Sequence, residues 1–398
     1  MVSPANLCII CKGSRALCGR EKCPLLARFR VEPKIEKRVS KDFFGPSMNV
    51  FVGRIGYPRV SIGPLTAIEL KARLDSPGSW FGMDYGDIIE LQSLLLRSKL
   101  RQDVHSRSRF VEETQELALA SKPTDVEMRF RRKPVYRMSF SDMYQPMGPS
   151  AALEKMRITE NPKISGRVEK IVRDDIKANE AGFLLYKTGQ DVYRISSILS
   201  SGIMGLEENK KLVPTRWSIT ATDDIVFKSL VSGVKDFPSV NDYLVYSSNY
   251  LDNRFEILLM PGNWEYENFE AWAPGSMWSF NLKKTEIIEE YESFRGRTAY
   301  ADKEGGGYYA ARLAVIEALW GMRRQARVVV FREIYEGYTV PLGVWQVREN
   351  ARNAFKGRPE VFKTLGEALK HIDSKLRLSI NDYINVSKIL KQRRLSDF

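Results

Sequence analysis

Histidine is almost missing from this sequence: His105 and His371 are the only two among 398 residues. Its ordinary pKa lies closest to neutrality of all side chains, which makes it the usual general acid or base and a frequent metal ligand. Two histidines far apart in the sequence exclude a histidine-rich metal centre and most catalysis of that kind. Any reaction carried out by this chain would have to use carboxylates, hydroxyls, lysine or arginine.

Long apolar runs are missing as well. No stretch approaches the roughly eighteen uninterrupted apolar residues that mark a membrane-spanning helix. The first residues, Met-Val-Ser-Pro-Ala-Asn, do not have the charged-then-apolar order of a signal peptide. We therefore expect no membrane contact and a cytoplasmic, nucleoid-associated location.

Cysteine is confined to one short stretch. The only four are Cys8, Cys11, Cys18 and Cys23, with the spacing C-x2-C-x6-C-x4-C. The two-residue gap lets the first pair of thiolates face one metal ion from a tight turn, and nearby glycines allow the chain to bend. Four thiolates match a closed tetrahedral Zn²⁺ site, which stabilises a fold and has no open position for substrate. We predict one structural zinc ion here.

Two other uses of these cysteines are less favoured by their spacing. Disulfide bonds would need an oxidising compartment, and small disulfide-rich domains spread their cysteines along the chain. An iron–sulfur cluster also takes four thiolates, but its usual spacings differ from this one. Both remain alternatives to zinc at this point.

Acidic residues are outnumbered by basic ones. Lys and Arg total 62 against 49 for Asp and Glu, which gives a net charge of +13. A basic excess of this size suits a polyanionic partner, most simply DNA. General solubility or a thermophilic habit would give a similar composition.

Helix-like and strand-like patterns alternate along the chain, without an internal repeat. Apolar spacing predicts helices over residues 85–101 and 110–120, and a period of two predicts a strand over 126–138. The charge-rich segment 282–294 is interpreted as helical and as a neighbourhood for a domain boundary. This mixture predicts an α+β (mixed α/β) fold with several regions and a small N-terminal zinc-binding loop.

The run Gly53-Arg54-Ile55-Gly56 is typical of a tight turn, with Pro58 close behind it. The same G-x-x-G spacing clamps a nucleic-acid backbone in KH domains. There the loop joins helices, whereas the flanks here are strand-like. We interpret this run as a turn that presents Arg54 to phosphate.

Asp223 and Asp224 form a carboxylate pair not far from Arg216. Adjacent carboxylates can bind Mg²⁺ or serve as acid and base. Thr222 directly before them is also a good helix cap, and acidic residues are favoured in a first helical turn. A helix start at Thr222 is therefore the favoured interpretation.

Three glycines beginning with Gly305 and Gly306 precede a strongly helical pattern. Backbone N–H groups at such a helix start can bind phosphate. The run has neither the Walker A sequence nor the Rossmann spacing, so an ordinary flexible turn is favoured. The candidate residues of a nucleic-acid or substrate cleft are Arg54, Arg216, Asp223, Asp224, Gly305 and Gly306.

The chain ends in a pattern that matches a docking motif. Gln392, Leu395 and Phe398 give Q-x-x-L-x-x-F, which resembles the PIP box that binds the sliding clamp PCNA. One helical turn places Leu395 and Phe398 on one side as apolar plugs. The motif has one aromatic residue where many have two, and an ordinary helix end is the alternative.

Several segments together resemble the archaeal Nre family of DNA-repair proteins, over nearly the whole chain. They are Asp42-Phe-Phe-Gly-Pro-Ser, Val52-Gly-Arg-Ile-Gly-Tyr-Pro, Pro214-Thr-Arg-Trp-Ser-Ile-Thr-Ala-Thr-Asp-Asp, Gly305-Gly-Gly-Tyr-Tyr-Ala-Ala-Arg and the two ends. The resemblance implies an N-terminal zinc finger at Cys8, Cys11, Cys18 and Cys23, and a PCNA-binding tail at Gln392, Leu395 and Phe398. It implies a role in the response to DNA damage, without a reaction or catalytic residues.

We therefore expect a DNA-repair protein that a clamp-binding tail recruits to DNA. The expected regions are a zinc-binding segment with a basic connector (1–40), an Nre-type N-terminal region (41–285), an Nre-type C-terminal region (286–385) and the tail (386–398). The alternative is an enzyme that acts on nucleic acid or nucleotide through the carboxylates and glycines of the candidate cleft.

Overall fold

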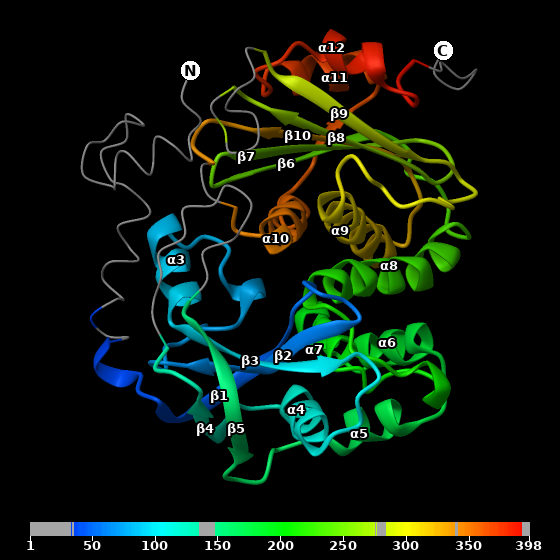
Figure 1. Ribbon diagram of the computed structural model, residues 1–398. Coiled ribbons are helices and arrows are strands. Elements are labelled where there is room, and N and C mark those ends of the chain that lie inside the picture. The colour runs from blue at the N-terminus through cyan, green and yellow to red at the C-terminus, as the bar shows by residue number, and fades with distance from the viewer. Residues whose placement is uncertain are drawn as a thin grey trace. The chain divides into compact units, whose positions relative to one another are not determined.

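The computed structural model describes residues 36–134, 148–274, 284–338 and 341–391, together with Pro33 and Ser276. Two compact units are formed, a barrel unit within Leu7–Val226 and a sheet unit within Phe227–Phe398. Both contain helices and strands, which confirms the expected α+β class (Figure 1). None of the helices in the described ranges is long and apolar enough to cross a membrane. The four cysteines of the predicted zinc loop lie outside these ranges.

The barrel unit is built on a closed barrel of five strands. They are β1 (Asp42–Val52), β2 (Arg59–Ala67), β3 (Leu95–Asp103), β4 (Thr124–Phe130) and β5 (Ser150–Ile158). Their order is β1-β2-β3-β5-β4, and β4 closes the barrel by pairing with β1. β3 and β5 run parallel, whereas the other neighbours are antiparallel. This order, with helix α4 (Arg109–Leu119) between β3 and β4, is the topology of the OB-fold.

The long first strand belongs to both halves of the barrel. Its residues up to Ser47 pair with β4, and those from Ser47 onward pair with β2. A register shift between Ser47 and Asn49 marks a bulge, which bends the strand between its two partners. Part of the interior is filled by Val52, Val60, Ile62, Val104, Val111 and Leu212.

The helix predicted over residues 85–101 is wrong in its second half. A helix, α3 (Tyr85–Ser93), starts behind Asp84, whose side chain accepts a hydrogen bond from the Gly86 N–H. β3 begins two residues after this helix. Burial of its side chains alternates with a period of two from Leu96 to Lys99, as in a strand. Ser98 is buried between Arg97 and Lys99, which are only partly covered. Arg97, Lys99 and Arg101, which fall in the second half of the predicted helix, thus lie on a strand.

Further helices complete the barrel unit. They are α5 (Gly166–Arg173), α6 (Ala178–Lys187), α7 (Val192–Ser200) and the start of α8 (Thr215–Val234), with short 3-10 turns at Pro77–Ser79 and Glu207–Asn209. α4 confirms the helix expected over residues 110–120, and β4 confirms the first part of the strand expected over 126–138. The expected helix start at Thr222 is wrong, because α8 begins seven residues earlier, behind Pro214.

The sheet unit is a six-stranded sheet with helices on both faces (Figure 1). Its strands are β6 (Tyr243–Tyr250), β7 (Asn253–Met260), β8 (Glu265–Trp272), β9 (Glu286–Glu292), β10 (Arg327–Ile334) and β11 (Glu360–Phe362). The order is β11-β6-β7-β10-β8-β9, and only β8 and β10 are parallel neighbours. α9 (Gly306–Met322) and α10 (Val344–Ala354) cover one face, and α11 (Leu365–Asp373) and α12 (Ile380–Val386) cover the other.

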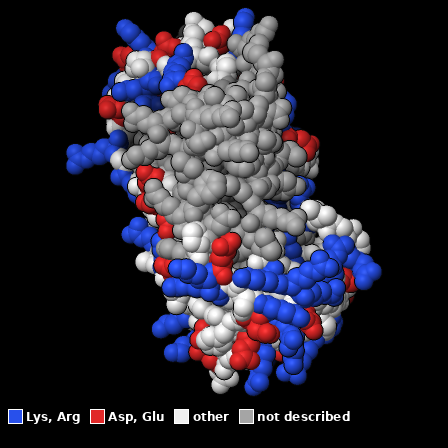
Figure 2. All heavy atoms as spheres, turned by 60° about the vertical axis from the view of Figure 1, so that its left-hand side comes forward, with Lys and Arg blue, Asp and Glu red and all other residues white. Residues whose placement is uncertain are grey.

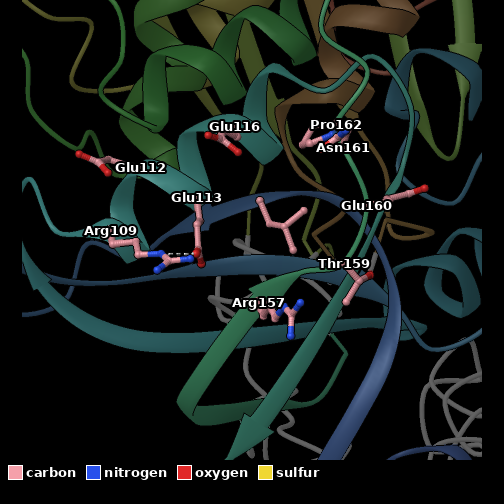
Figure 3. A pocket seen from close by; sticks show the side chains of 10 residues that line it. Arg109, Glu112, Glu113, Glu116, Arg157, Thr159, Glu160, Asn161 and Pro162 are labelled. Carbon is pink, nitrogen blue, oxygen red and sulfur yellow. Dashed lines mark hydrogen bonds and ion pairs between the residues drawn. The ribbon is translucent and has the colours of Figure 1, made fainter.

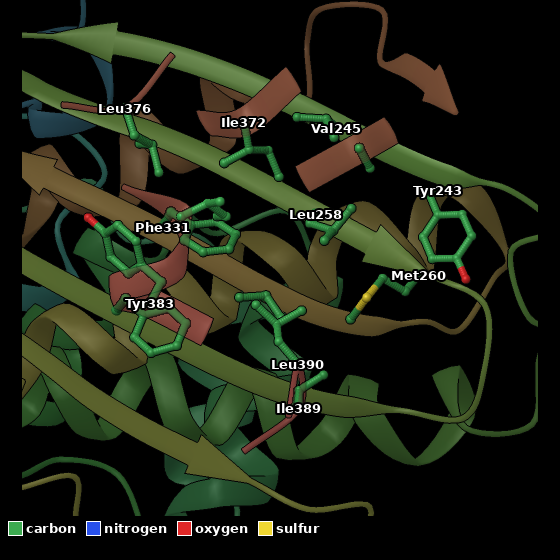
Figure 4. Packing of buried hydrophobic residues seen from close by; sticks show 14 of the residues in the cluster. Tyr243, Val245, Leu258, Met260, Phe331, Ile372, Leu376, Tyr383, Ile389 and Leu390 are labelled. Carbon is green, nitrogen blue, oxygen red and sulfur yellow. The ribbon is translucent and has the colours of Figure 1, made fainter. Parts of the chain in front are cut away.

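The core under α11 and α12 includes the last described part of the chain. Phe331 of the sheet packs in one cluster with Tyr383 of α12 and with Ile389 and Leu390 (Figure 4). The ring centroids of Phe331 and Tyr383 lie 5.2 Å apart in an edge-to-face arrangement. The chain is therefore held in the core of this unit up to Leu390. The tail motif that begins at Gln392 lies outside the described residues.

The helix predicted over residues 282–294 is a strand, β9, in the part that the structure describes. Its register against β8, from Tyr266↔Glu292 to Trp272↔Glu286, fixes it as the edge strand of the sheet. Glutamate favours helices, but here pairing along the whole strand outweighs that preference. The division of the chain at residue 285/286 stays a prediction.

Candidate nucleic-acid interface

A tightly held loop joins β1 to β2 at one end of the barrel. The Gly53 N–H donates to the carbonyl oxygen of Ser61 at 2.7 Å, and the Arg59 N–H donates to that of Gly56 at 2.9 Å. Gly56 has a φ of +81°, and a Cβ added there would lie 2.5 Å from Nη2 of Arg101. Glycine alone both adopts this positive φ without strain and leaves room for the Arg101 side chain. The expected tight turn is confirmed.

This loop carries an exposed tyrosine that contacts an exposed tryptophan. Tyr57 and Trp217 are 42% and 46% exposed, and their ring centroids lie 5.2 Å apart at an interplanar angle of 53°. Trp217 lies in the first turn of α8, where its backbone N–H donates to the carbonyl oxygen of Pro214 at 2.7 Å. The Val52 N–H at the end of β1 donates to Thr215 Oγ1 at 3.0 Å. We call Tyr57 and Trp217 the aromatic pair.

Two of the predicted site residues lie next to the aromatic pair. Arg54 is in the same loop as Tyr57, Arg216 directly precedes Trp217, and both are exposed. Within the part of the chain that the structure describes, neither arginine forms an ion pair. The structure thus brings Arg54 and Arg216 into one region of the barrel unit.

The outer side of β2 and β3 continues this positive region. Arg59, Arg97, Lys99 and Arg101 project from it and are called the basic face. Cross-strand pairs place Ser61 beside Arg101 and Leu65 beside Arg97. Between them Gly63 has no side chain, and a Cβ there would clash with the Ser98 carbonyl group. The glycine therefore lets β2 and β3 approach closely at the middle of the face.

Partial burial lowers the pKa values of two cations of the basic face, Arg97 and Lys99. Burial lowers the pKa of Arg97 to about 10, and its guanidinium lies 5.5 Å from the centre of the Phe51 ring. Burial, and then repulsion by Arg97, lowers the pKa of Lys99. A phosphate between the two cations would relieve that repulsion.

The described surface of the barrel unit is rich in positive charge. Figure 2 shows Lys and Arg side chains spread over the part of this unit that it displays, with acidic side chains among them. On β4 such a mixture neutralises Arg129, which lies 3.8 Å from carboxylates of both Asp42 and Glu154. Arg54 and Arg216, which form no ion pair with a described residue, are therefore better placed than Arg129 to bind a phosphate.

Asp223 and Asp224 do not lie in a first helical turn, as a helix start at Thr222 would require. Both lie in the middle of α8, where Asp223 is 1% exposed. They belong to the barrel unit, whereas Gly305 and Gly306 belong to the sheet unit. The cleft of the alternative enzyme interpretation would need residues from both units. None of these four residues lines the cavity of about 450 Å³ beside α4 that is described below.

The glycines at the start of α9 face carboxylates instead of an open anion site. Gly305 has a φ of +55°, and a Cβ on Gly307 would lie 2.5 Å from Oε1 of Glu270. Glu304, directly before the glycines, accepts a hydrogen bond from Asn268. Burial, and then the nearby Glu270 carboxylate, raises the pKa of Glu304 well above its ordinary value. Two carboxyl groups at this helix start disfavour a phosphate.

Two buried ion pairs hold four other charged side chains of the sheet unit. Arg332 pairs with Glu270, its cross-strand neighbour, and donates to Asn253 Oδ1 from Nη2 at 2.7 Å. Arg312 pairs with Glu292 in the same unit. Each of these four charges is thus paired with an opposite charge inside the unit.

A cavity of about 450 Å³ opens between α4 and the end of β5 (Figure 3). Four glutamates and two arginines line it, and one arginine, Arg109, is paired with Glu113 at 3.0 Å. The lining charges are those of Arg109, Glu112, Glu113, Glu116, Arg157 and Glu160. Its net negative charge makes this cavity unsuitable for a nucleic-acid backbone.

Within the described ranges, no group of three or more His, Cys, Asp or Glu is placed to hold a metal ion. The four cysteines and the tail residues Gln392, Leu395 and Phe398 lie outside those ranges, so the zinc and PCNA predictions stay predictions. The aromatic pair was missed from the sequence. Its signal was present, because Tyr57 and Trp217 stand inside two of the motifs that carry the family resemblance.

Comparison with curated proteins gives relatives along most of the chain. The DNA repair protein NreA of Archaeoglobus fulgidus is 42% identical over 368 residues, which cover 91% of this chain and 92% of that protein. NreB of the same organism is 38% identical over 391 residues, or 97% of both chains. NreA of Haloferax volcanii is 36% identical over 366 residues, 88% of this chain and 87% of that protein.

Two family descriptions also match. "Archaeal Nre, N-terminal" matches residues 17–279, and "Archaeal Nre, C-terminal" matches residues 292–398. No solved structure matches the chain, so the barrel topology rests on the strand order given above. Because both family regions are present and the relatives match over nearly their whole length, the chain belongs to the archaeal Nre family, as its motifs had indicated.

Proposed function

We propose that this chain acts in DNA repair and binds DNA on the barrel unit. The names of its relatives, all DNA repair proteins, support the repair role. The observation that carries the DNA contact is the basic face on a closed barrel of OB topology. Barrels of this topology bind oligonucleotides on the face of strands 2 and 3, next to the loop between strands 1 and 2.

The charges of the basic face suit the sugar–phosphate backbone. Arginine binds phosphate with a planar fork of donors, and lysine adds a compact charge. Each neutralised phosphate releases condensed counterions, so binding weakens as salt rises. A chain with a net charge of +13 gains further attraction at long range.

The tail would recruit the protein to the sliding clamp PCNA. Gln392, Leu395 and Phe398 supply the polar and apolar plugs of a PIP box. Leu390 is packed in the core of the sheet unit, so the motif starts two residues beyond a fixed point. Tethering at the clamp raises the local concentration at DNA, and a modest DNA affinity then suffices.

The four N-terminal cysteines would hold one structural Zn²⁺. Their number and spacing support this assignment, and their thiolates would fill all four positions of a tetrahedral ion. Zinc would stabilise the N-terminal segment, because metal binding contributes folding free energy. It would take no part in a reaction.

The DNA contact is tested by reversing charges on the basic face. Arg59→Glu combined with Lys99→Glu should weaken binding to a DNA oligonucleotide at least about tenfold and lower the slope of log K against log salt by about 2. Arg167→Glu, an exposed reversal on α5 of the same unit, is the matched control. Equal binding by the double variant and the control would contradict the proposal.

A further inference from the structure

We propose that the aromatic pair, Tyr57 and Trp217, is a stacking platform for the bases of single-stranded DNA. This inference rests on the proposed function, because it names the form of DNA that the barrel unit selects. Single-stranded DNA arises wherever a strand is opened or resected during repair. A protein that acts there needs contacts that duplex DNA cannot make.

The exposure of the two rings is the first argument. Tyr57 and Trp217 contact each other, yet each keeps more than two fifths of its surface in water. Large aromatic residues normally bury most of their area, so two exposed rings in contact mark a binding surface. A base offers a flat π-face to either ring, and stacking does not depend on which base it is.

The rigidity of the two supports is the second argument. The hydrogen bonds of the β1–β2 loop and the contact of Gly56 with Arg101 fix the backbone on either side of Tyr57. Pro214 and Thr215 fix the first turn of α8, on which Trp217 stands. The rings are presented from elements that are already ordered. Binding then loses little conformational freedom, which favours affinity.

The charges around the rings decide between DNA and an apolar protein partner. Arg54 and Arg216 flank the aromatic pair and form no ion pair with a described residue, and Arg59 is exposed at the start of β2. Rings that alternate with cations match a strand whose bases alternate with phosphates. An apolar protein surface would leave these arginines without partners.

The unpaired state of the DNA follows from the geometry of stacking. In a duplex both faces of every internal base are covered by neighbours, so a side chain reaches a base face only after the base is unstacked. Phosphate contacts with the basic face are possible for either form of DNA. The aromatic pair therefore adds affinity for single strands alone.

The test compares exposed aromatic residues in the full-length protein. Binding of a fluorescent (dT)20 and of a 20-base-pair duplex is measured for the wild type, Tyr57→Ala, Trp217→Ala and Trp217→Phe. Trp320→Ala is the matched control, because Trp320 is 43% exposed on α9 of the sheet unit. Trp217→Ala should weaken (dT)20 binding roughly tenfold or more, and Trp217→Phe should restore most of it. Duplex binding and the control should change less than about twofold.

The outcomes separate this inference from the proposed function. Unchanged (dT)20 binding by Tyr57→Ala and Trp217→Ala, with salt-dependent DNA binding retained, would overturn the stacking platform and leave the DNA contact standing. Equal losses for duplex and single strand in Trp217→Phe, at an unchanged circular dichroism spectrum, would also overturn it. A wild-type protein that binds neither DNA would overturn the proposed function as well.

Discussion

Arg101 of β3 and Ile55 of the β1–β2 loop are joined by a hydrogen bond, in which Nη1 donates to the Ile55 carbonyl oxygen at 3.0 Å. The same guanidinium packs against Gly56. One residue of the basic face thus holds the loop that carries Tyr57. Arg101 thus connects the strand proposed to bind phosphate with the loop proposed to stack bases.

Gly56→Ala should disturb this loop. The new Cβ would meet Arg101 at 2.5 Å, and the φ of +81° is strained for alanine. We expect a loss of about 1–2 kcal/mol in the free energy of unfolding, together with weaker binding of single-stranded DNA. Urea unfolding measures the first effect. Gly82→Ala, where φ is also positive but nothing lies within 4 Å, is the control for strain alone. Equal losses for the two variants would contradict the role of Arg101.

Arg312→Met should destabilise the sheet unit strongly. Arg312 is 2% exposed, pairs with Glu292 and lies 3.7 Å from the centre of the Phe227 ring. The variant would leave a buried carboxylate without its cation, at a cost of about 3–5 kcal/mol. Lys363→Met, which breaks the exposed pair with Asp242, should cost less than about 1 kcal/mol. Similar unfolding midpoints for the two variants would show that the buried pair is not needed.

Glu267 should make the stability of the sheet unit depend on pH. Burial raises the pKa of Glu267 to about 7, above an ordinary value of 4.5. The folded protein then holds a proton that the unfolded chain releases between these two values. Its stabilising contribution is complete below about pH 4.5 and is lost as pH rises through about 7, by about 3 kcal/mol in total.

Glu267→Gln should remove this dependence. Glutamine resembles the protonated acid and keeps an oxygen that can accept from the Lys388 N–H, a bond of 2.5 Å in the wild type. The difference in unfolding free energy between variant and wild type, measured by urea unfolding from pH 5 to pH 8, should therefore grow with pH in favour of the variant. Parallel pH profiles would refute the raised pKa.

The purified protein should contain one zinc ion per chain, measured by elemental analysis. Cys11→Ser removes one of four thiolates, so zinc should fall towards zero. Retention of zinc in this variant would show that the ion is held elsewhere. An iron-type visible spectrum would favour the iron–sulfur alternative.

Phe398→Ala should abolish binding to PCNA in isothermal titration calorimetry, because it removes an apolar plug of the tail motif. Asp397→Ala changes a neighbouring residue outside the Q-x-x-L-x-x-F positions and should bind like the wild type. Unchanged binding by Phe398→Ala would mean that the tail is not the docking motif.

Local signals in the sequence predicted local structure well. The two glycines and Pro58 predicted the turn between β1 and β2, because such turns need residues with these backbone preferences. Arg97 was misplaced because the apolar run before it fits a helix as well as a strand. Thr222 was misread as a cap because α8 already starts behind Pro214.

Contacts between distant segments could not be predicted in this way. Arg332 and Glu270 are 62 residues apart, and the parallel register of β8 and β10 makes them neighbours. Tyr57 meets Trp217 across an even longer separation, through the start of α8. The family motifs marked both regions, but only the fold shows that the two rings touch.

Photocrosslinking tests the central claim, DNA binding on the barrel unit, most directly. A (dT)20 oligonucleotide that carries photoreactive bases is irradiated with the full-length protein, and the crosslinked peptides are identified by mass spectrometry. DNA binding on the barrel unit predicts crosslinks in the β1–β2 loop, in β2 and β3 and at the start of α8, including Tyr57 and Trp217. Crosslinks confined to residues 227–398 would contradict it.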